Sequence, residues 1–185
     1  MKFLPFLLVL SLPACTGIVD KSDMPIAKNI VGSYYLTAKD GYLYEARCAD
    51  IDATIQSTEW CIGIQAFDSG NEYFKTPQDY DTYLSNKLWW DEKLFEKLAF
   101  ERQRSIVSPL PKGTTIRITK LVQFPWGSNG YYWAIRAVLI ETDNEIELPT
   151  NTVLAFPTWL IGYGVQHEPQ FDPEYLTRCS SVECT

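Results

Sequence analysis

The chain is short of the residues on which most catalytic and metal sites depend. Its 185 residues include a single histidine, His167, in the polar stretch VQHEPQ. A zinc site would need several cysteine or histidine ligands at short spacing, and the sequence contains no CxxC pair. A Ser-His-Asp triad would have to use His167, and no serine lies in a nucleophile-elbow context. Nucleotide-binding and calcium-loop patterns are also missing. We therefore expect a non-enzymatic protein with no catalytic residue, no cofactor and no metal.

Positive charge is also scarce, with 16 lysines and arginines against 23 aspartates and glutamates, a net charge of −7. An acidic chain gains nothing from phosphate backbones or anionic head groups, so nucleic acid and electrostatic membrane binding are disfavoured. A basic protein partner would instead be attracted. The alternation of Glu145 and Glu147 predicts a solvated strand face, which explains these carboxylates without a glycosidase pair.

No apolar run is long enough to cross a bilayer as a helix. The longest one near the N-terminus, Phe3 to Leu12, follows Lys2 and is far shorter than the roughly 20 residues that a span requires. Charge followed by a short apolar segment is the order of a secretory signal.

The signal ends in Leu12-Pro13-Ala14-Cys15, which resembles the lipobox of bacterial lipoproteins. In that family the cysteine sulfur receives lipid, the signal is cut before the cysteine, and the new amine is acylated with a fatty acid such as palmitate. The resemblance implies lipidation at Cys15. Thr16 stands where an aspartate would favour inner-membrane retention, so the resemblance implies the periplasmic face of the outer membrane. An ordinary signal peptide cut near Ala14 is the alternative.

Lipid on Cys15 leaves four of the five cysteines. An even number in an exported chain indicates two disulfides, for which three pairings are possible. We favour Cys48–Cys61 and Cys179–Cys184, because each pair is close in sequence and bounded by turn-forming residues.

The rest of the chain is expected to form one domain, since 46% of the residues are hydrophobic and 21% are charged. We expect a signal peptide over 1–14, a lipidated tether over 15–29, a single β-rich domain over 30–178 and a disulfide-stapled tail over 179–185. The tether is predicted because its segment is polar, contains a proline and has no sustained period.

Period-two alternation predicts strands on both sides of one helical segment. The stretches YYLTAKDGYLYEAR, TTIRITKLV and YYWAIRAVLIE alternate or are rich in β-branched and aromatic residues. Between them a helical insertion is expected over about 77–104, capped by Thr76 and with a break at Ser85-Asn86. Its apolar stripe would be Leu84, Leu88, Phe95 and Leu98.

The stretch LPKGTTIRITKL and the opening YYLTAKDGYLYEAR resemble bacterial SH3-like domains. The fold class we expect is mainly β (α+β), a small SH3-like β-barrel or a sandwich with one inserted amphipathic helical segment. The resemblance implies an envelope-structural module that binds peptidoglycan. Trp126, Tyr131 and Trp133 would then stack on sugars, unless they belong to the core.

The high aromatic content, 14% of the residues, favours a second function. Trp89, Trp90 and Phe100 fall partly off the helical stripe, so they either widen its buried face or form an exposed patch. With the turn from Trp126 to Asn129, they are the candidate contacts for a periplasmic protein partner. The chain would then be a protein-binding lipoprotein, for example an inhibitor or an immunity factor.

Overall fold

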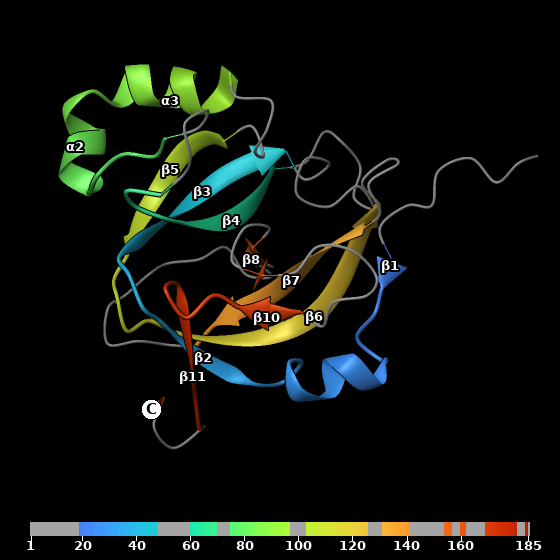
Figure 1. Cartoon of the computed structure of the whole chain (residues 1–185). Helices are drawn as coiled ribbons and strands as arrows, with labels where there is room; N and C mark the ends of the chain where they lie inside the picture. Colours follow the sequence, from blue (N-terminus) through green and yellow to red (C-terminus); the bar gives the residue numbers. More distant parts are fainter. Residues whose placement is uncertain are drawn as a thin grey trace, which may run out of the picture.

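The computed structural model describes residues 19–47, 60–69, 75–96, 103–125, 131–140, 154–156, 160–161, 169–180 and 184. Within these ranges short strands dominate and helices are few (Figure 1). In chain order the elements are β1 (Val19–Asp20), η1 (Pro25–Asn29), β2 (Tyr34–Thr37), β3 (Gly41–Arg47), β4 (Trp60–Ala66), α2 (Tyr80–Ser85), α3 (Lys87–Glu96), β5 (Gln103–Leu110), β6 (Thr115–Pro125), β7 (Tyr131–Leu139), β8 (Leu154–Phe156), β9 (Leu160–Ile161), β10 (Gln170–Phe171) and β11 (Leu176–Cys179).

The main sheet has the strand order β11-β2-β6-β7-β8-β4-β3-β5, and β1 pairs with β6 beside this path. Neighbouring strands are antiparallel except β4 and β8, which pair in parallel at Gly63 and Ala155. The end strands β11 and β5 do not pair with each other, so the described sheet is not a closed barrel. The expected mainly β, α+β fold class is thus confirmed, without barrel closure.

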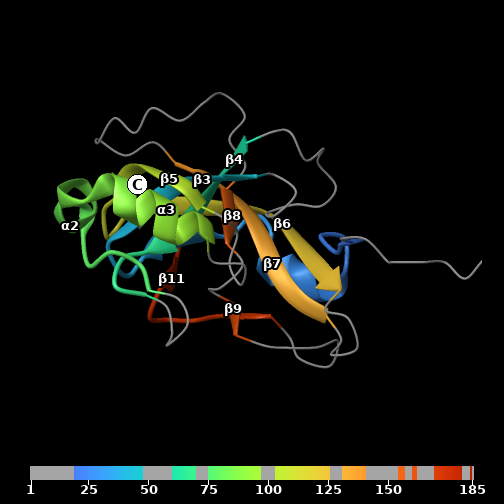
Figure 2. The ribbon, with the colours of Figure 1, turned by 90° about the horizontal axis from the view of Figure 1, so that it is seen from above.

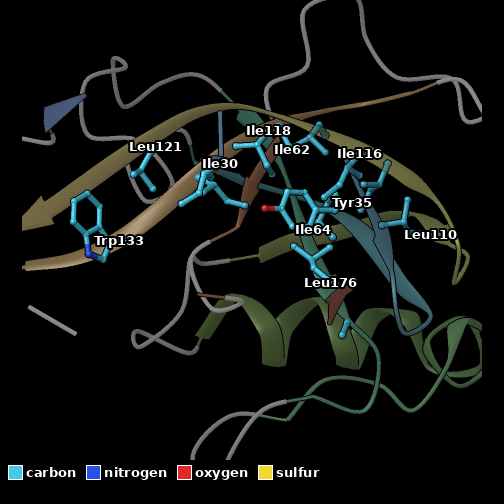
Figure 3. Packing of buried hydrophobic residues seen from close by; sticks show 14 of the residues in the cluster. Ile30, Tyr35, Ile62, Ile64, Leu110, Ile116, Ile118, Leu121, Trp133 and Leu176 are labelled. Atoms are coloured by element: carbon cyan, nitrogen blue, oxygen red, sulfur yellow. The ribbon is translucent and has the colours of Figure 1, made fainter. Parts of the chain in front are cut away.

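The main core lies inside the curved sheet. Strands from both ends of the path contribute to it, Leu176 of β11 at one end and Leu110 of β5 at the other (Figure 3). Tyr35 of β2 and Ile64 of β4 belong to the same core. Trp133 belongs to this core and is only 4% exposed. Its proposed stacking on sugars is therefore wrong, because a ring buried against aliphatic side chains offers no face to a glycan.

A second cluster, here called the aromatic cluster, lies on the opposite face of β3. Tyr42 and Tyr44 point into it, whereas Leu43 between them points into the main core, so β3 is buried on both faces. Helices α2 and α3 cover this face and add Tyr83 and Leu94 (Figure 1). Two-sided burial explains why β3 lacks the hydrophobic–polar alternation of a surface strand.

The helical segment is shorter than expected. It begins at Tyr80, and its cap is Asp79, whose carboxylate accepts a hydrogen bond from the Thr82 amide at 2.7 Å. Thr76 is not the cap: its hydroxyl instead donates to the Ala66 carbonyl at 3.2 Å and ties the preceding loop to β4. The expected extension to residue 104 is also wrong, because residues 103 and 104 already belong to β5.

The break near residue 86 is confirmed, and it changes which side chains are buried. Asn86 has φ −146° and ψ 50°, so α2 and α3 are separate helices with different phases. Leu84 and Leu88 of the predicted stripe are exposed, while Tyr83 and Leu94 are fully buried. The prediction of an apolar stripe assumed one continuous helix. Because the helix breaks at Asn86, residues before and after the break do not share one face. Leu98 lies outside the described residues.

The segment predicted as a tether is largely part of the domain. Residues 19–20 pair with β6, and residues 25–29 form η1. Ala27 is fully buried in the main core together with Ile30. The folded domain therefore begins by Val19 rather than at residue 30. The polar residues of this segment belong to the outer side of β1 and η1, and both elements are too short to show a hydrophobic period in the sequence.

One expected disulfide is present: Cys179 and Cys184 are bonded, with 6.0 Å between their Cα atoms. The Cys184 carbonyl accepts a hydrogen bond from the Thr115 hydroxyl at 2.8 Å, which fastens the tail to β6. Cys61 is also disulfide-bonded. Its expected partner Cys48 and the lipidation candidate Cys15 lie outside the described residues, so both assignments stay predictions.

Candidate partner-binding surface on α2 and α3

The helices expose three large apolar side chains. The exposed fractions are 50% for Leu84, 84% for Leu88 and 44% for Trp89. We call these three residues, together with Trp90 and Lys93, the helical surface. Single exposed apolar residues are common on proteins. Here three of them, including a tryptophan, lie within six positions of the chain.

The two tryptophans of α3 have different roles. Their rings meet edge to face, with 4.7 Å between the ring centres. Trp90 is half-buried and packs against the aromatic cluster, whereas Trp89 faces outward. The ammonium of Lys93 lies 4.2 Å from the centre of the Trp89 ring and 5.4 Å from that of Trp90. The half-buried Trp90 ring thus supports the exposed Trp89 ring, and the Lys93 ammonium lies over both rings.

Tyr83 fixes both helices to the sheet. Its buried hydroxyl donates to the Asp91 carboxylate of α3 at 2.8 Å and accepts from the Ile106 amide of β5 at 3.2 Å. Asp91 also pairs with Lys87 one helical turn earlier. Because β5 is the end strand of the sheet, the Ile106 amide would otherwise lack a strand partner, and the tyrosine satisfies it.

The electrostatics of α3 come mainly from this hydrogen-bonded group. The hydrogen bond from Lys87 to Asp91 raises the pKa of Lys87 to about 12, with a smaller contribution from Tyr83. Burial raises the pKa of Tyr83. Asp81 and Glu96 are exposed and carry negative charge beside the apolar side chains. The helical surface is therefore apolar except for Lys93, and Lys87 is exposed beside it together with these two acidic residues.

A second exposed aromatic lies on the sheet and was not singled out from the sequence. Trp60 of β4 is 40% exposed, and the Arg104 guanidinium lies 4.6 Å from the centre of its ring. The sequence placed Arg104 in the helical segment, which concealed this cross-strand contact. The pattern RQRSIV before a proline, with its β-branched residues, was the available signal for a strand.

The structure places only part of the predicted site. Trp89 and Trp90 are adjacent on α3, with Trp89 exposed and Trp90 half-buried. The other candidates, Phe100, Trp126 and Asn129, lie outside the described residues. Leu84 and Leu88, assigned to the buried stripe, are the members of the helical surface that sequence reasoning missed.

Over the described ranges, no three His, Cys, Asp or Glu side chains gather where a metal ion could bind. Nor does any helix found there have the length and apolarity to cross a membrane. Comparisons of the chain with protein-family models, with curated proteins and with solved structures gave no match.

Proposed function

We propose that the protein is a non-enzymatic lipoprotein, anchored through Cys15 to the periplasmic face of the outer membrane, that binds a protein partner. An inhibitor or an immunity factor that neutralises an incoming toxin or hydrolase fits this description. The observation that carries the proposal is the exposure of Leu88 and Trp89 on a helix that is otherwise well fixed to the sheet.

A fixed apolar surface suits binding because little conformational entropy is lost when a partner covers it. Trp90 and Lys93 hold the Trp89 ring on one side, and Tyr83 holds the helix on the other. Tryptophan is also enriched among the residues that contribute most to binding energy at interfaces. The helical surface therefore has the composition and the rigidity of a binding site.

The charge of the chain indicates the chemistry of the partner. The net charge is −7, and Asp81, Glu92 and Glu96 are exposed on the two helices. Opposite charges on a partner would speed association and orient it before apolar contact. The partner proposed is therefore a basic protein with an apolar patch. Peptidoglycan binding was the alternative function, and one of its three aromatic candidates, Trp133, is buried in the core.

The experiment compares two tryptophans of similar exposure. Trp89→Ala and Trp60→Ala each remove an exposed indole, one from the helical surface and one from the sheet. Each variant and the unchanged lipoprotein are used as bait in periplasmic extract, and stoichiometric partners are identified. We expect a partner that the unchanged protein and Trp60→Ala retain and Trp89→Ala loses.

Two results would contradict the proposal. One is a partner that binds the unchanged protein and Trp89→Ala equally. The other is sedimentation with purified cell wall without any stoichiometric protein partner, which would favour the peptidoglycan function. Circular dichroism of each variant shows whether a loss of binding reflects a loss of fold.

A further inference from the structure

The first described residues place the sheet close to the expected lipid anchor. Val19 and Asp20 pair with Gln123 and Val122 of β6. The amide of Lys21 then donates to the Leu121 carbonyl at 2.8 Å. Three residues, 16–18, separate Cys15 from Val19, and the four Cα–Cα steps between Cys15 and Val19 span at most about 14 Å in any conformation. A lipid on Cys15 would therefore keep β1 within that distance of the bilayer surface.

Nothing in the following residues can lengthen this connection without unfolding part of the domain. Ala27 of η1 is fully buried, and Ile30 is 6% exposed in the main core. The Gly32 amide donates to the Ile118 carbonyl at 2.8 Å, so the chain is again bound to β6 before β2 begins. The distance from the anchor to the domain is thus set by residues 16–18 alone.

The surface around β1 and η1 has the composition of a lipid-contacting face. Val19 and Met24 are exposed apolar residues, 39% and 42% accessible. Lys21, between β1 and η1, is half-exposed, and Lys28 of η1 and Lys120 of β6 are exposed. We call these five residues the anchor-side face. The three lysines of this face carry positive charge, and two aspartates nearby in the sequence carry negative charge. Asp20 pairs with Lys120 at 3.6 Å, and Asp23 is exposed.

We propose that the anchor-side face lies against the phospholipid head groups when Cys15 is lipidated. The inference rests on the anchoring in the proposed function, and it adds a surface and an orientation. Apolar side chains beside lysines suit the boundary between head groups and acyl chains. The weak charge of the face is sufficient because the covalent lipid, rather than the lysines, supplies the attachment.

This orientation gives the helical surface a defined position. Figures 1 and 2 show α2 and α3 at the end of the molecule opposite to β1 and η1. With the anchor-side face on the membrane, α2 and α3 lie at the end of the domain that is away from the bilayer. The protein would then present its partner-binding surface without the long flexible tether that many anchored domains need.

The test is lysine acylation of the full-length lipidated protein on vesicles of phosphatidylethanolamine and phosphatidylglycerol, read by mass spectrometry. The reference is the unlipidated Cys15→Ala protein in solution. We expect several-fold lower labelling of Lys21, Lys28 and Lys120 on vesicles. Exposed Lys75 and Lys112 serve as controls and are expected to label equally in both samples.

A second variant tests whether the lower labelling requires the short connection between Cys15 and β1, or whether vesicles lower the labelling in general. It carries about 20 flexible Gly and Ser residues between Gly17 and Ile18, a mean span of about 25 Å. We expect this insertion to restore labelling of the three lysines to near the level in solution. The proposal would be overturned if each of the five lysines were labelled to the same extent on vesicles as in solution. Failure of the full-length protein to sediment with the vesicles would also overturn it. Neither result depends on Trp89, so the capture experiment judges partner binding separately.

Discussion

Gly63 on β4 lies directly opposite Tyr44 of β3, and the pair shows how one residue shapes the helical side of the sheet. A Cβ atom at position 63 would overlap the Tyr44 ring, which is 1% exposed in the aromatic cluster. The ring therefore lies over the glycine, and this position has no room for a side chain.

Gly63→Ala should accordingly lower the free energy of unfolding by about 1–3 kcal/mol, the usual effect of overpacking a core. Urea denaturation measures the change. If the Tyr44 ring is the cause, the double variant Gly63→Ala/Tyr44→Ala loses less stability than the sum of the single changes. Strict additivity would contradict this explanation.

Alanine substitutions of Trp89 and Trp90 should have different effects on stability. Trp90 packs against the aromatic cluster, so Trp90→Ala should lower the free energy of unfolding by about 1–3 kcal/mol. Trp89 is exposed, so Trp89→Ala should change it by less than about 0.5 kcal/mol. Thermal unfolding of both variants measures the difference, and equal losses would show that Trp89 is also a packing residue. The sequence could not show which of the two tryptophans is buried, because that depends on which side of the helix packs against the rest of the domain.

Among the elements, the contact between the two helices and β5 depends on one hydroxyl. Tyr83→Phe removes the group that accepts from the Ile106 amide and donates to Asp91. An unsatisfied buried amide costs about 1–3 kcal/mol. We expect a loss of stability in that range and faster hydrogen exchange at Ile106. A variant with unchanged exchange at Ile106 would show that the tyrosine does not hold this edge of the sheet.

The hydrogen-bonded group of Tyr83, Lys87 and Asp91 should make the helices sensitive to alkaline pH. The pKa of Lys87 is raised above its ordinary value of 10.5 to about 12, so its contribution to stability is complete below 10.5 and is lost as pH approaches 12. The pKa of Tyr83 is raised above 10, and its contribution is lost in the same direction. Tryptophan fluorescence should report loosening of α3 between pH 10 and 12. Lys87→Gln should flatten this change, and an identical profile for both proteins would refute the assignment.

At this scale the sequence predicted the main strands and the helical break well, and the cap and the buried stripe poorly. Alternation identified β6, and the long apolar run YYWAIRAVLIE identified β7; both strands contribute side chains to the main core. Asn86 was recognised because its residue type favours a break, but the phases of α2 and α3 depend on packing against β5. The prediction of the cap failed because the Thr76 hydroxyl accepts from the Ser69 amide and donates toward the carbonyls of Ser69 and Ala66, and propensity cannot reveal these contacts.

For the whole molecule, the sequence predicted the fold class and the closing disulfide but not the start of the domain. The bond between Cys179 and Cys184 joins residues five positions apart, so spacing was informative. Residues 19–29 are too short and too polar to show that Ala27 reaches the core. That difference matters for the proposed orientation, because only three residues lie between β1 and Cys15, the proposed lipidation site. Helices α2 and α3 lie at the end of the molecule opposite to β1 (Figures 1 and 2).

The helical surface is proposed to bind a basic protein partner. The most direct measurement is titration calorimetry of the captured partner against the unchanged protein, Trp89→Ala and Trp60→Ala. We expect saturable one-to-one binding that Trp60→Ala preserves and Trp89→Ala weakens at least about 10-fold, which corresponds to a loss of about 1.4 kcal/mol or more. Equal affinity of the unchanged protein and Trp89→Ala, with both proteins folded, would contradict it.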